Sequence, residues 1–320
     1  MIDDINAAAR RLAGHAIRTP LLNAPLLDDE AGRRIFVKAE CLQKTGSFKY
    51  RGARNAVASL TAEERAAGVI AFSSGNHAQG VALAAREMGA PAIIVMPSDA
   101  PDLKIDNTRK LGAEVVLYDR ASESRDDIGA ELAEQRNLSL IKPFDDVRVI
   151  AGQGTCGLEI AEQASEAGVE AEDVLICCGG GGLTSGISLA LAARAPALTP
   201  RPVEPEGFDD VARSLAAGAI QVNNRRSGSL CDAIITPSPG EITFPILAAH
   251  CGAGVVVTED EALRAIAVAF TRLKIVLEPG GAVALAAALF HREDDADVIA
   301  VASGGNVDAP VFRMALERYG

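Results

Sequence analysis

The chain of 320 residues is long enough for two packed units, and 48% hydrophobic with 23% charged residues is the composition of a globular protein. Its formal net charge of −12, without a long basic run, argues against nucleic acid or an anionic membrane as the main partner. No apolar run is long enough to cross a bilayer and the acidic start of the chain is unlike a signal peptide, so we expect a cytoplasmic protein with reduced cysteines.

The first half of the chain alternates short apolar runs with helical patterns. This alternation predicts a parallel sheet covered by helices. In chain order the patterns are a strand at 33–40, a helix at 48–60 with Ser47 as its N-cap, a strand at 68–72, a helix at 77–89, a strand at 92–96, a helix at 102–112, a strand at 114–118 and a helix at 124–136.

A second series of the same kind begins near residue 150. Within it, the proline-marked stretch 196–207 predicts a loop and a turn. We interpret the two series as two lobes, with ligands in the cleft beyond the carboxyl ends of the strands. The second series consists of a helix at 156–168, a strand at 173–178, a helix at 182–194, a strand at 254–258, helices at 259–273 and 281–292, and a strand at 298–302.

Four consecutive glycines stand between an apolar strand and a helix in "CCGGGGLTSG", residues 177–186. Consecutive glycines let backbone N–H groups turn inward, and the following helix adds the positive end of its dipole. A simple turn needs only one or two glycines, so the run favours a phosphate site. No lysine follows the glycines as it does in the nucleotide P-loop.

Two other strand-to-loop transitions carry small polar residues. In "FSSGNHAQG", residues 72–80, the turn can present N–H groups to a carboxylate and the side chains of Ser73, Ser74 and Asn76 to a ligand. A capped helix start would also explain this stretch. The third transition is "VASGGN", residues 301–306, and three such loops in one chain are more than turns alone explain.

Two further motifs point to other chemistry. The stretch "GQGTCG", residues 152–157, matches the dinucleotide pattern, but Glu172 and Asp173, the acids at the expected spacing, begin the next strand rather than end it. A nicotinamide-dependent oxidoreductase is therefore kept as a remote alternative. The acids of "VEPEGFDD", residues 203–210, lie on a predicted loop and suit Mg²⁺ or Ca²⁺, although a solvated acidic loop explains them equally well.

Lys49 stands in "KTGSFKYRGA", residues 44–53, near the start of a predicted helix. A phosphate site without a P-loop lysine, together with a lysine elsewhere, suggests pyridoxal phosphate, which is bound through a lysine amine. Cationic neighbours and the helix N-terminus would lower the pKa of the Lys49 amine and make it nucleophilic.

The stretches "TGSFKYRGA", "SSGNHAQG", "GGGGLTSG" and "SGGN" occur in the order and approximate spacing of fold-type II pyridoxal-phosphate enzymes. The chain most resembles the serine/threonine dehydratase and serine racemase family, over nearly its whole length. The resemblance implies a two-lobed α/β fold like that of the tryptophan synthase β-chain, with mostly parallel sheets and the cofactor in the cleft. It implies a large cofactor-binding domain at 1–60 and 148–320, a small domain at 61–147, and a homodimer.

The resemblance also assigns residues. Lys49 would hold the cofactor and move the substrate proton, Phe48 would pack near the ring, Asn76 would bond the ring hydroxyl and Ser303 would face the pyridine nitrogen. The cofactor phosphate would be bound by Gly179, Gly180, Gly181, Gly182 and Leu183. The substrate would meet Ser73, Ser74, Asn76, His77, Arg125 and Ser238. A divalent cation, Mg²⁺ or Ca²⁺, would be bound by Glu204, the Phe208 carbonyl and Asp210.

The implied activity is a dehydratase, or ammonia-lyase, that converts L-threonine, L-serine or a related β-hydroxy amino acid to a 2-oxo acid and ammonia by β-elimination. The alternatives on the same fold are a serine racemase, in which Ser74 would be the second acid/base, and a 3-hydroxyaspartate dehydratase. Little chain follows "SGGN", so we expect no feedback domain and a catabolic role. A non-catalytic protein that binds a small molecule is the non-enzyme alternative.

Overall fold

Two separate sheets organise the chain in the computed structural model, which describes residues 1–73, 75–100, 102–119, 122–291 and 295–320. The larger sheet has the strand order β1-β2-β10-β7-β8-β9 and the smaller has the order β5-β4-β3-β6. The strands are β1 (Leu21–Leu22), β2 (Ile35–Lys38), β3 (Val69–Phe72), β4 (Ala92–Pro97), β5 (Glu114–Tyr118), β6 (Ser139–Leu140), β7 (Ala171–Cys177), β8 (Thr199–Pro205), β9 (Val255–Val257) and β10 (Asp297–Val301).

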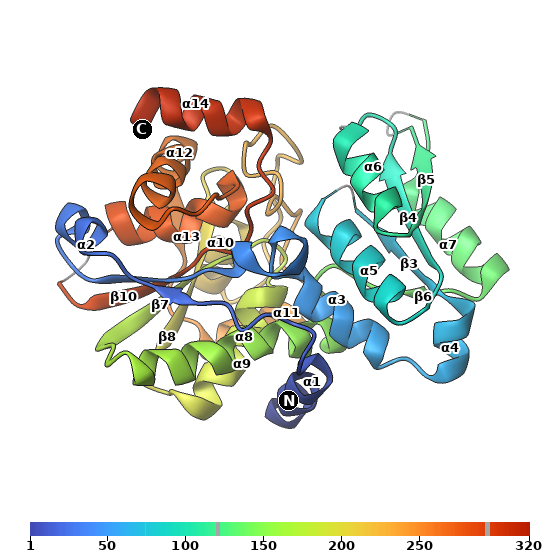
Figure 1. Ribbon diagram of the computed structural model, residues 1–320, viewed down its shortest axis with the longest axis horizontal. Coiled ribbons are helices and arrows are strands. Elements are labelled where there is room, and N and C mark those ends of the chain that lie inside the picture. The colour runs from blue at the N-terminus through green and yellow to red at the C-terminus, as the bar shows by residue number, and fades with distance from the viewer. Residues whose placement is uncertain (74, 101, 120–121, 292–294) are drawn as a thin grey trace.

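Helices cover both sheets, and they group into two lobes in Figure 1. The helices are α1 (Ile2–Leu12), α2 (Pro25–Ala31), α3 (Lys49–Ala58), α4 (Ala62–Ala67), α5 (Asn76–Glu87), α6 (Asp102–Lys110), α7 (Arg125–Arg136), α8 (Val147–Glu166), α9 (Gly182–Arg194), α10 (Asp210–Ala217), α11 (Thr243–His250), α12 (Glu259–Val268), α13 (Pro279–Phe290) and α14 (Ala309–Tyr319). Short 3₁₀ turns span Glu40–Leu42 and Lys44–Gly46, and a π-helical turn spans Ala269–Leu273.

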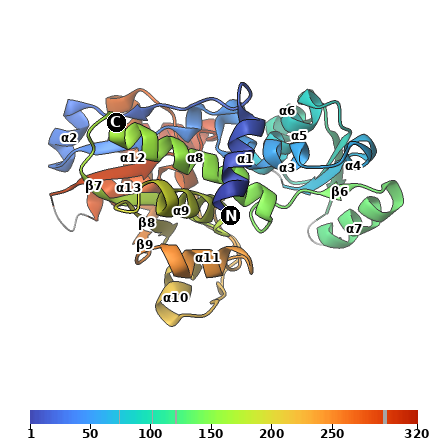
Figure 2. The same ribbon diagram turned by 90° about the horizontal axis from the view of Figure 1, so that it is seen from below.

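The strands pair in parallel, except that β1 is antiparallel to β2. In the larger sheet, α8 and α9 run side by side along one face, and α13 covers the other, with α12 packed against α13 (Figures 1 and 2). In the smaller sheet, Ile94 and Met96 on one face belong to a hydrophobic cluster with residues of α5. Ile70 and Ile93 on the other face belong to a cluster with residues of α7. Both faces of each sheet are therefore buried, and the predicted mixed α/β fold with mostly parallel sheets is confirmed.

The smaller sheet takes all its strands from residues 69–140, and the larger takes its strands from both sides of that segment in the chain. We propose the domain division at 1–60 with 148–320 and at 61–147 on the resemblance given above. The six cysteines are all unpaired thiols within the described chain. Across the described residues, no helix is both long and apolar enough to span a bilayer.

The predicted loop at 196–207 is wrong, because Thr199–Pro205 forms strand β8. Pro200 and Pro202 are tolerated for a reason that the sequence does not reveal. This part of β8 pairs only with β7, and the β9 ladder begins at Val203. The Pro200 carbonyl accepts a hydrogen bond from Gly252 N on the side away from β7. The backbone nitrogen of Pro200 faces the same side, where no strand is paired with this part of β8, so the missing N–H costs no ladder hydrogen bond.

The dinucleotide-like motif lies inside α8, which begins at Val147 and not at residue 156 as expected. Its glycines allow close helix packing. A Cβ at Gly152 would lie 2.6 Å from the Arg51 carbonyl oxygen of α3, and one at Gly157 would lie 2.9 Å from the Ile187 carbonyl oxygen of α9. The motif therefore serves helix contacts and forms no strand-to-helix turn for a pyrophosphate.

Candidate active site

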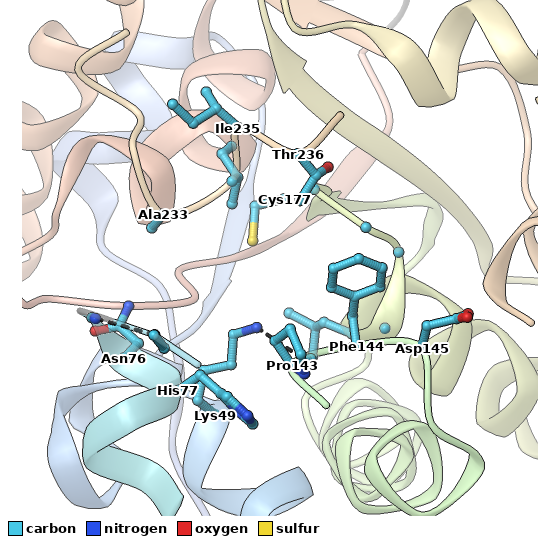
Figure 3. Close-up of a pocket in the computed structure, with 18 of the residues that line it drawn as sticks. Lys49, Asn76, His77, Pro143, Phe144, Asp145, Cys177, Ala233, Ile235 and Thr236 are labelled. Atoms are coloured by element: carbon cyan, nitrogen blue, oxygen red, sulfur yellow. Dashed lines mark hydrogen bonds between the residues drawn. The ribbon is translucent and has the colours of Figure 1, made fainter. Parts of the chain in front are cut away.

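A cavity of about 620 Å³ opens where strands β3 and β7 end, between the two sheets (Figure 3). Both strands reach it with their carboxyl ends, as expected for a ligand site in parallel sheets. The predicted site residues that line the cavity are Phe48, Lys49, Ser73, Asn76, His77, Arg125, Gly179, Gly180, Gly181, Gly182, Leu183 and Ser238. Ser303 is buried and is not part of the cavity lining, and Ser74 lies outside the described residues.

Lys49 is the first residue of α3, and its side chain ends in the cavity (Figure 3). Its Nζ donates a hydrogen bond to the Pro143 carbonyl at 3.0 Å and lies 5.2 Å from the centre of the Phe48 ring. Burial lowers the pKa of the Lys49 amine to about 8, and this effect outweighs those of Cys177 and Glu278, which raise the pKa. The lowered pKa agrees with expectation, but desolvation causes it rather than cationic neighbours.

The turn before Lys49 is held against the "SGGN" loop at the end of β10. Thr45 and Gly46 are both left-handed, with φ of 61° and 74°. Ser47 then forms an isolated bridge with Gly304, and Gly305 N donates to the Gly46 carbonyl at 2.9 Å. The first backbone bond of α3 runs from Arg51 N to the Phe48 carbonyl, so Phe48, not Ser47, is the N-cap, which corrects the expected cap.

The four glycines form a tight loop at the start of α9. Gly181 has φ of +90° and is the N-cap, so a side chain there would be strained. A Cβ at Gly180 would overlap the Phe144 ring, and one at Gly179 would lie 2.9 Å from the Ile234 carbonyl oxygen. Because the first N–H groups of a helix have no partner within it, the start of α9 offers donors to an anion in the cavity. The loop fits the phosphate group of a small cofactor.

Asn76, the first residue of α5, is fixed by two hydrogen bonds. Its Nδ2 donates to Glu278 Oε1 at 2.6 Å, and its Oδ1 accepts from Asn306 Nδ2 at 2.7 Å. These contacts determine which side of the amide carries the donor, and one Nδ2–H remains for a ligand. Burial raises the pKa of the Glu278 carboxyl to about 7.

His77 is a neutral structural residue in this arrangement. Burial lowers the pKa of its imidazole to about 3. Its Nε2 lies 2.8 Å from the Ile141 carbonyl oxygen, which can only accept, so Nε2 carries the proton. His77 therefore ties α5 to the segment after β6 and is not placed to act as an acid at neutral pH.

Four residues of the site were not predicted from the sequence: Phe144, Cys177, Glu278 and Asn306. Phe144 and Cys177 line the cavity, and Glu278 and Asn306 hold Asn76. The sequence does offer an indication of Glu278, because it is the one acid in the apolar stretch "IVLEPGGAVALAAALF". Nothing in the sequence indicates Phe144, since only the folded chain brings it against the glycine loop.

The predicted metal ligands lie apart from the cavity lining, and not on a loop as expected. Glu204 belongs to β8, Phe208 to the following turn, and Asp210 begins α10. Burial and the nearby Asp210 raise the pKa of Glu204 well above its ordinary value, and burial raises the pKa of Asp210 to about 6.

Glu204 accepts hydrogen bonds from Val211 N at 2.9 Å and Ala212 N at 2.7 Å. Asp210 Oδ1 accepts from Asn223, while its Oδ2 is buried with no hydrogen-bond partner among the described residues. In the part of the chain that the structure describes, no group of three or more His, Cys, Asp or Glu side chains is placed to hold a metal.

Comparison with known proteins gives a consistent result. The family model described as pyridoxal-phosphate dependent enzyme matches residues 12–304. The chain is 42% identical to the L-threo-3-hydroxyaspartate ammonia-lyase of a Pseudomonas species, over 98% of each chain. It is 37% identical to the serine racemase of Schizosaccharomyces pombe, over 99% of this chain and 95% of that protein. A solved structure of the T.th. threonine deaminase superposes with a TM-score of 0.90 at 45% identity, covering 96% of this chain and 98% of that one.

Proposed function

Because this chain belongs to the pyridoxal-phosphate-dependent enzymes, we propose that it is a dehydratase (ammonia-lyase) that converts a β-hydroxy amino acid to a 2-oxo acid and ammonia. The observation that carries the proposal is the Lys49 amine, with its lowered pKa, in the cavity that the glycine loop also lines. An amine with a pKa of about 8 is a far better base at neutral pH than an ordinary lysine.

The residues present fit the cofactor. The start of α9 and the glycines that precede it would hold the phosphate, and the remaining Nδ2–H of Asn76 would bond the ring hydroxyl. Bound pyridoxal phosphate supplies an electron sink that acidifies the Cα–H bond of an amino acid attached to it. Lys49 would accept the Cα proton. The Ser303 hydroxyl can donate to the pyridine nitrogen but cannot keep it protonated as an aspartate would, which limits electron withdrawal and favours elimination over transamination.

The substrate class is tested by a panel of L-serine, L-threonine and the 3-hydroxyaspartates, scored for 2-oxo acid, ammonia and leftover enantiomer. The name of the Pseudomonas relative, an L-threo-3-hydroxyaspartate ammonia-lyase, favours a hydroxylated dicarboxylic substrate. The cavity lining carries the cations Lys49, Lys104 and Arg125 and also the acids Asp145, Asp232, Glu241 and Glu278, and Lys104 pairs with Asp232 and Asp308. Absence of 2-oxo acid from every member of the panel would contradict the proposed function.

Racemisation is the second candidate, and relatives named serine racemase favour it. Racemisation needs a second acid/base on the face of the substrate opposite Lys49, and the resemblance assigns that role to Ser74. We expect Ser74→Ala to keep dehydration of the L-substrate within about tenfold, well inside the usual 10²–10⁴ of an acid/base group, and to remove racemisation and action on D-substrates. The measurement is 2-oxo acid formation from each enantiomer, with chiral analysis of the remaining substrate. Continued racemisation by this variant would exclude Ser74 as the second acid/base.

A divalent cation at Glu204, the Phe208 carbonyl and Asp210 completes the proposal. Two buried carboxyl groups and a carbonyl are hard oxygen ligands suited to Mg²⁺ or Ca²⁺. Without a cation, the protonated Asp210 carboxyl contributes stability that is present below its ordinary pKa of 3.8 and lost as pH rises through about 6.

We therefore expect a divalent cation to raise the melting temperature of EDTA-treated protein more at pH 7.5 than at pH 5. Thermal unfolding with and without Mg²⁺ or Ca²⁺ at both pH values measures the difference, and Asp210→Asn should abolish it. If EDTA changed neither activity nor melting temperature, and elemental analysis found no ion, the two carboxyl groups would be a structural pair only.

We further propose a homodimer, as the resemblance implies. Leu42, Phe270 and Val276 are large apolar side chains that the chain leaves exposed. Light scattering should give about twice the chain mass of 33.2 kDa.

A further inference from the structure

The buried hydroxyl of Thr243 supports the glycine loop on the side away from the cavity. Thr243 is the first residue of α11, is fully buried and does not line the cavity. Its Oγ1 donates to the Gly180 carbonyl at 2.6 Å and accepts from Gly240 N at 2.9 Å. The Gly240 carbonyl is a more distant acceptor for the same proton, at 3.3 Å. Thr243 therefore holds the Gly180 carbonyl on the protein side of the loop.

The position of Thr243 is itself fixed from outside the glycine loop. Asp145, which precedes α8, accepts hydrogen bonds through its Oδ1 from Ile242 N at 2.9 Å and Thr243 N at 3.3 Å. The side chain of Thr243 is also packed directly against the loop, since a Cβ at Gly181 would lie 3.1 Å from the Thr243 Cβ. The hydroxyl is thus presented to the loop from a rigid support.

The geometry of the peptide between Gly180 and Gly181 turns this contact toward the cavity. No cis peptide is found among the described residues, and in a trans peptide the C=O and N–H point in opposite directions. Because the Gly180 carbonyl points to Thr243, the Gly181 N–H points to the cavity that Gly181 lines. The first bond of α9 runs from Ser185 N to the Gly181 carbonyl at 2.8 Å, so the Gly181 N–H has no acceptor within the helix.

We propose that Thr243 is a positioning residue for the cofactor phosphate: its hydroxyl fixes the Gly180–Gly181 peptide so that the Gly181 N–H donates to the phosphate. The inference rests on the proposed function only in requiring pyridoxal phosphate, and it is independent of which amino acid is the substrate. Glycines on both sides of a peptide allow it many orientations. Without the hydroxyl, the Gly180 carbonyl would keep only its longer contact with Gly240 N, at 3.2 Å. Thr243 thus supplies the order that a run of glycines lacks.

Three variants of the whole protein test the hydroxyl. Thr243→Val replaces the hydroxyl by a methyl group of similar size, and Thr243→Ser keeps the hydroxyl but removes the methyl group. Ser188→Ala is the matched control, because it removes a buried hydroxyl that donates to the Thr184 carbonyl within α9 and does not line the cavity. The measurement is titration of each cofactor-free protein with pyridoxal phosphate and with pyridoxal, which lacks the phosphate, followed by visible absorption.

We expect Thr243→Val to weaken the binding of pyridoxal phosphate by about threefold to tenfold, the worth of one hydrogen bond, and that of pyridoxal by less than about twofold. Thr243→Ser and Ser188→Ala should bind both ligands like the unchanged protein. The phosphorus NMR shift of the bound cofactor should move in Thr243→Val and stay in place in the other two variants. If Thr243→Val does not fold, Thr243→Ala and Thr243→Ser differ by the hydroxyl alone and give the same comparison.

The proposal is overturned if removal of the Thr243 hydroxyl leaves the binding of pyridoxal phosphate unchanged, or if it weakens both ligands equally. A phosphate-dependent loss of the same size in Thr243→Ser or Ser188→Ala would also overturn it. No substrate is present in these titrations. A failed substrate panel together with the expected phosphate-dependent loss would therefore contradict the proposed reaction and leave the role of Thr243 standing.

Discussion

Lys49→Ala is expected to abolish turnover and the visible absorption of bound cofactor while leaving the fold intact. An acid/base group alone is worth about 10²–10⁴ in rate, and Lys49 would also be the point of attachment for the cofactor. The cost to stability should be small. The Lys49 residue as a whole is half-buried although its amine is enclosed, and that amine makes one hydrogen bond among the described residues, to the Pro143 carbonyl. Ammonia release, the absorption spectrum and thermal unfolding measure the three quantities.

Lys44→Ala is the matched control, because Lys44 lies in the same segment but pairs with Glu87 at 2.8 Å and does not line the cavity. We expect this control to keep both the absorption band and ammonia release within a few-fold of the unchanged protein. Substantial ammonia release by Lys49→Ala, or equal losses in both variants, would reject the assignment of Lys49.

Gly180→Ala is the second change with a large expected effect, and it acts on cofactor binding. The added Cβ would overlap the Phe144 ring, and the Phe144 backbone lies so close to Gly182 that a Cβ there would be 2.9 Å from the Phe144 Cα. Overpacking of this kind costs about 1–3 kcal/mol, so cofactor affinity should fall by about tenfold to a hundredfold. Titration of cofactor-free protein with pyridoxal phosphate measures the loss.

A compensating change separates overpacking from other causes. Phe144→Ala in the Gly180→Ala background removes the ring that the new Cβ would meet, and part of the lost affinity should return. If Gly180→Ala bound the cofactor normally, the glycine loop would not be the tight phosphate site described above. If Phe144→Ala restored nothing, the overlap with the ring would not be the cause.

The family, the fold class and most of the main elements could be predicted from the sequence. Apolar periodicity and glycine position are local properties, so "CCGGGGLTSG" indicates a strand, a tight loop and a helix start before any tertiary contact is known. The structure has β7 and α9 on either side of these glycines, with α9 at the residues expected. The lining of the cavity by Lys49 and the glycine loop agrees with the roles that the resemblance assigns to them.

The errors arose where the decisive partner is distant in the chain. Pro200 and Pro202 indicate a loop by their own preferences, yet they fit a strand because β9 pairs only with the end of β8. The glycines of "GQGTCG" match a dinucleotide turn, yet they serve the contacts of α8 with α3 and α9. In both cases a tertiary neighbour overrode the local pattern.

The assembly of the site depends on the folded chain. Glu278 and Asn306 reach Asn76 because the "SGGN" loop, which follows β10, is bonded to the turn before Lys49. The pKa of Lys49 likewise follows from the packing around it, since burial and not sequence neighbours lowers it. The motifs to which the resemblance assigns the chemistry are evident in the sequence, because they are local. Their mutual contacts are not, because strand register and desolvation arise only when distant segments pack together.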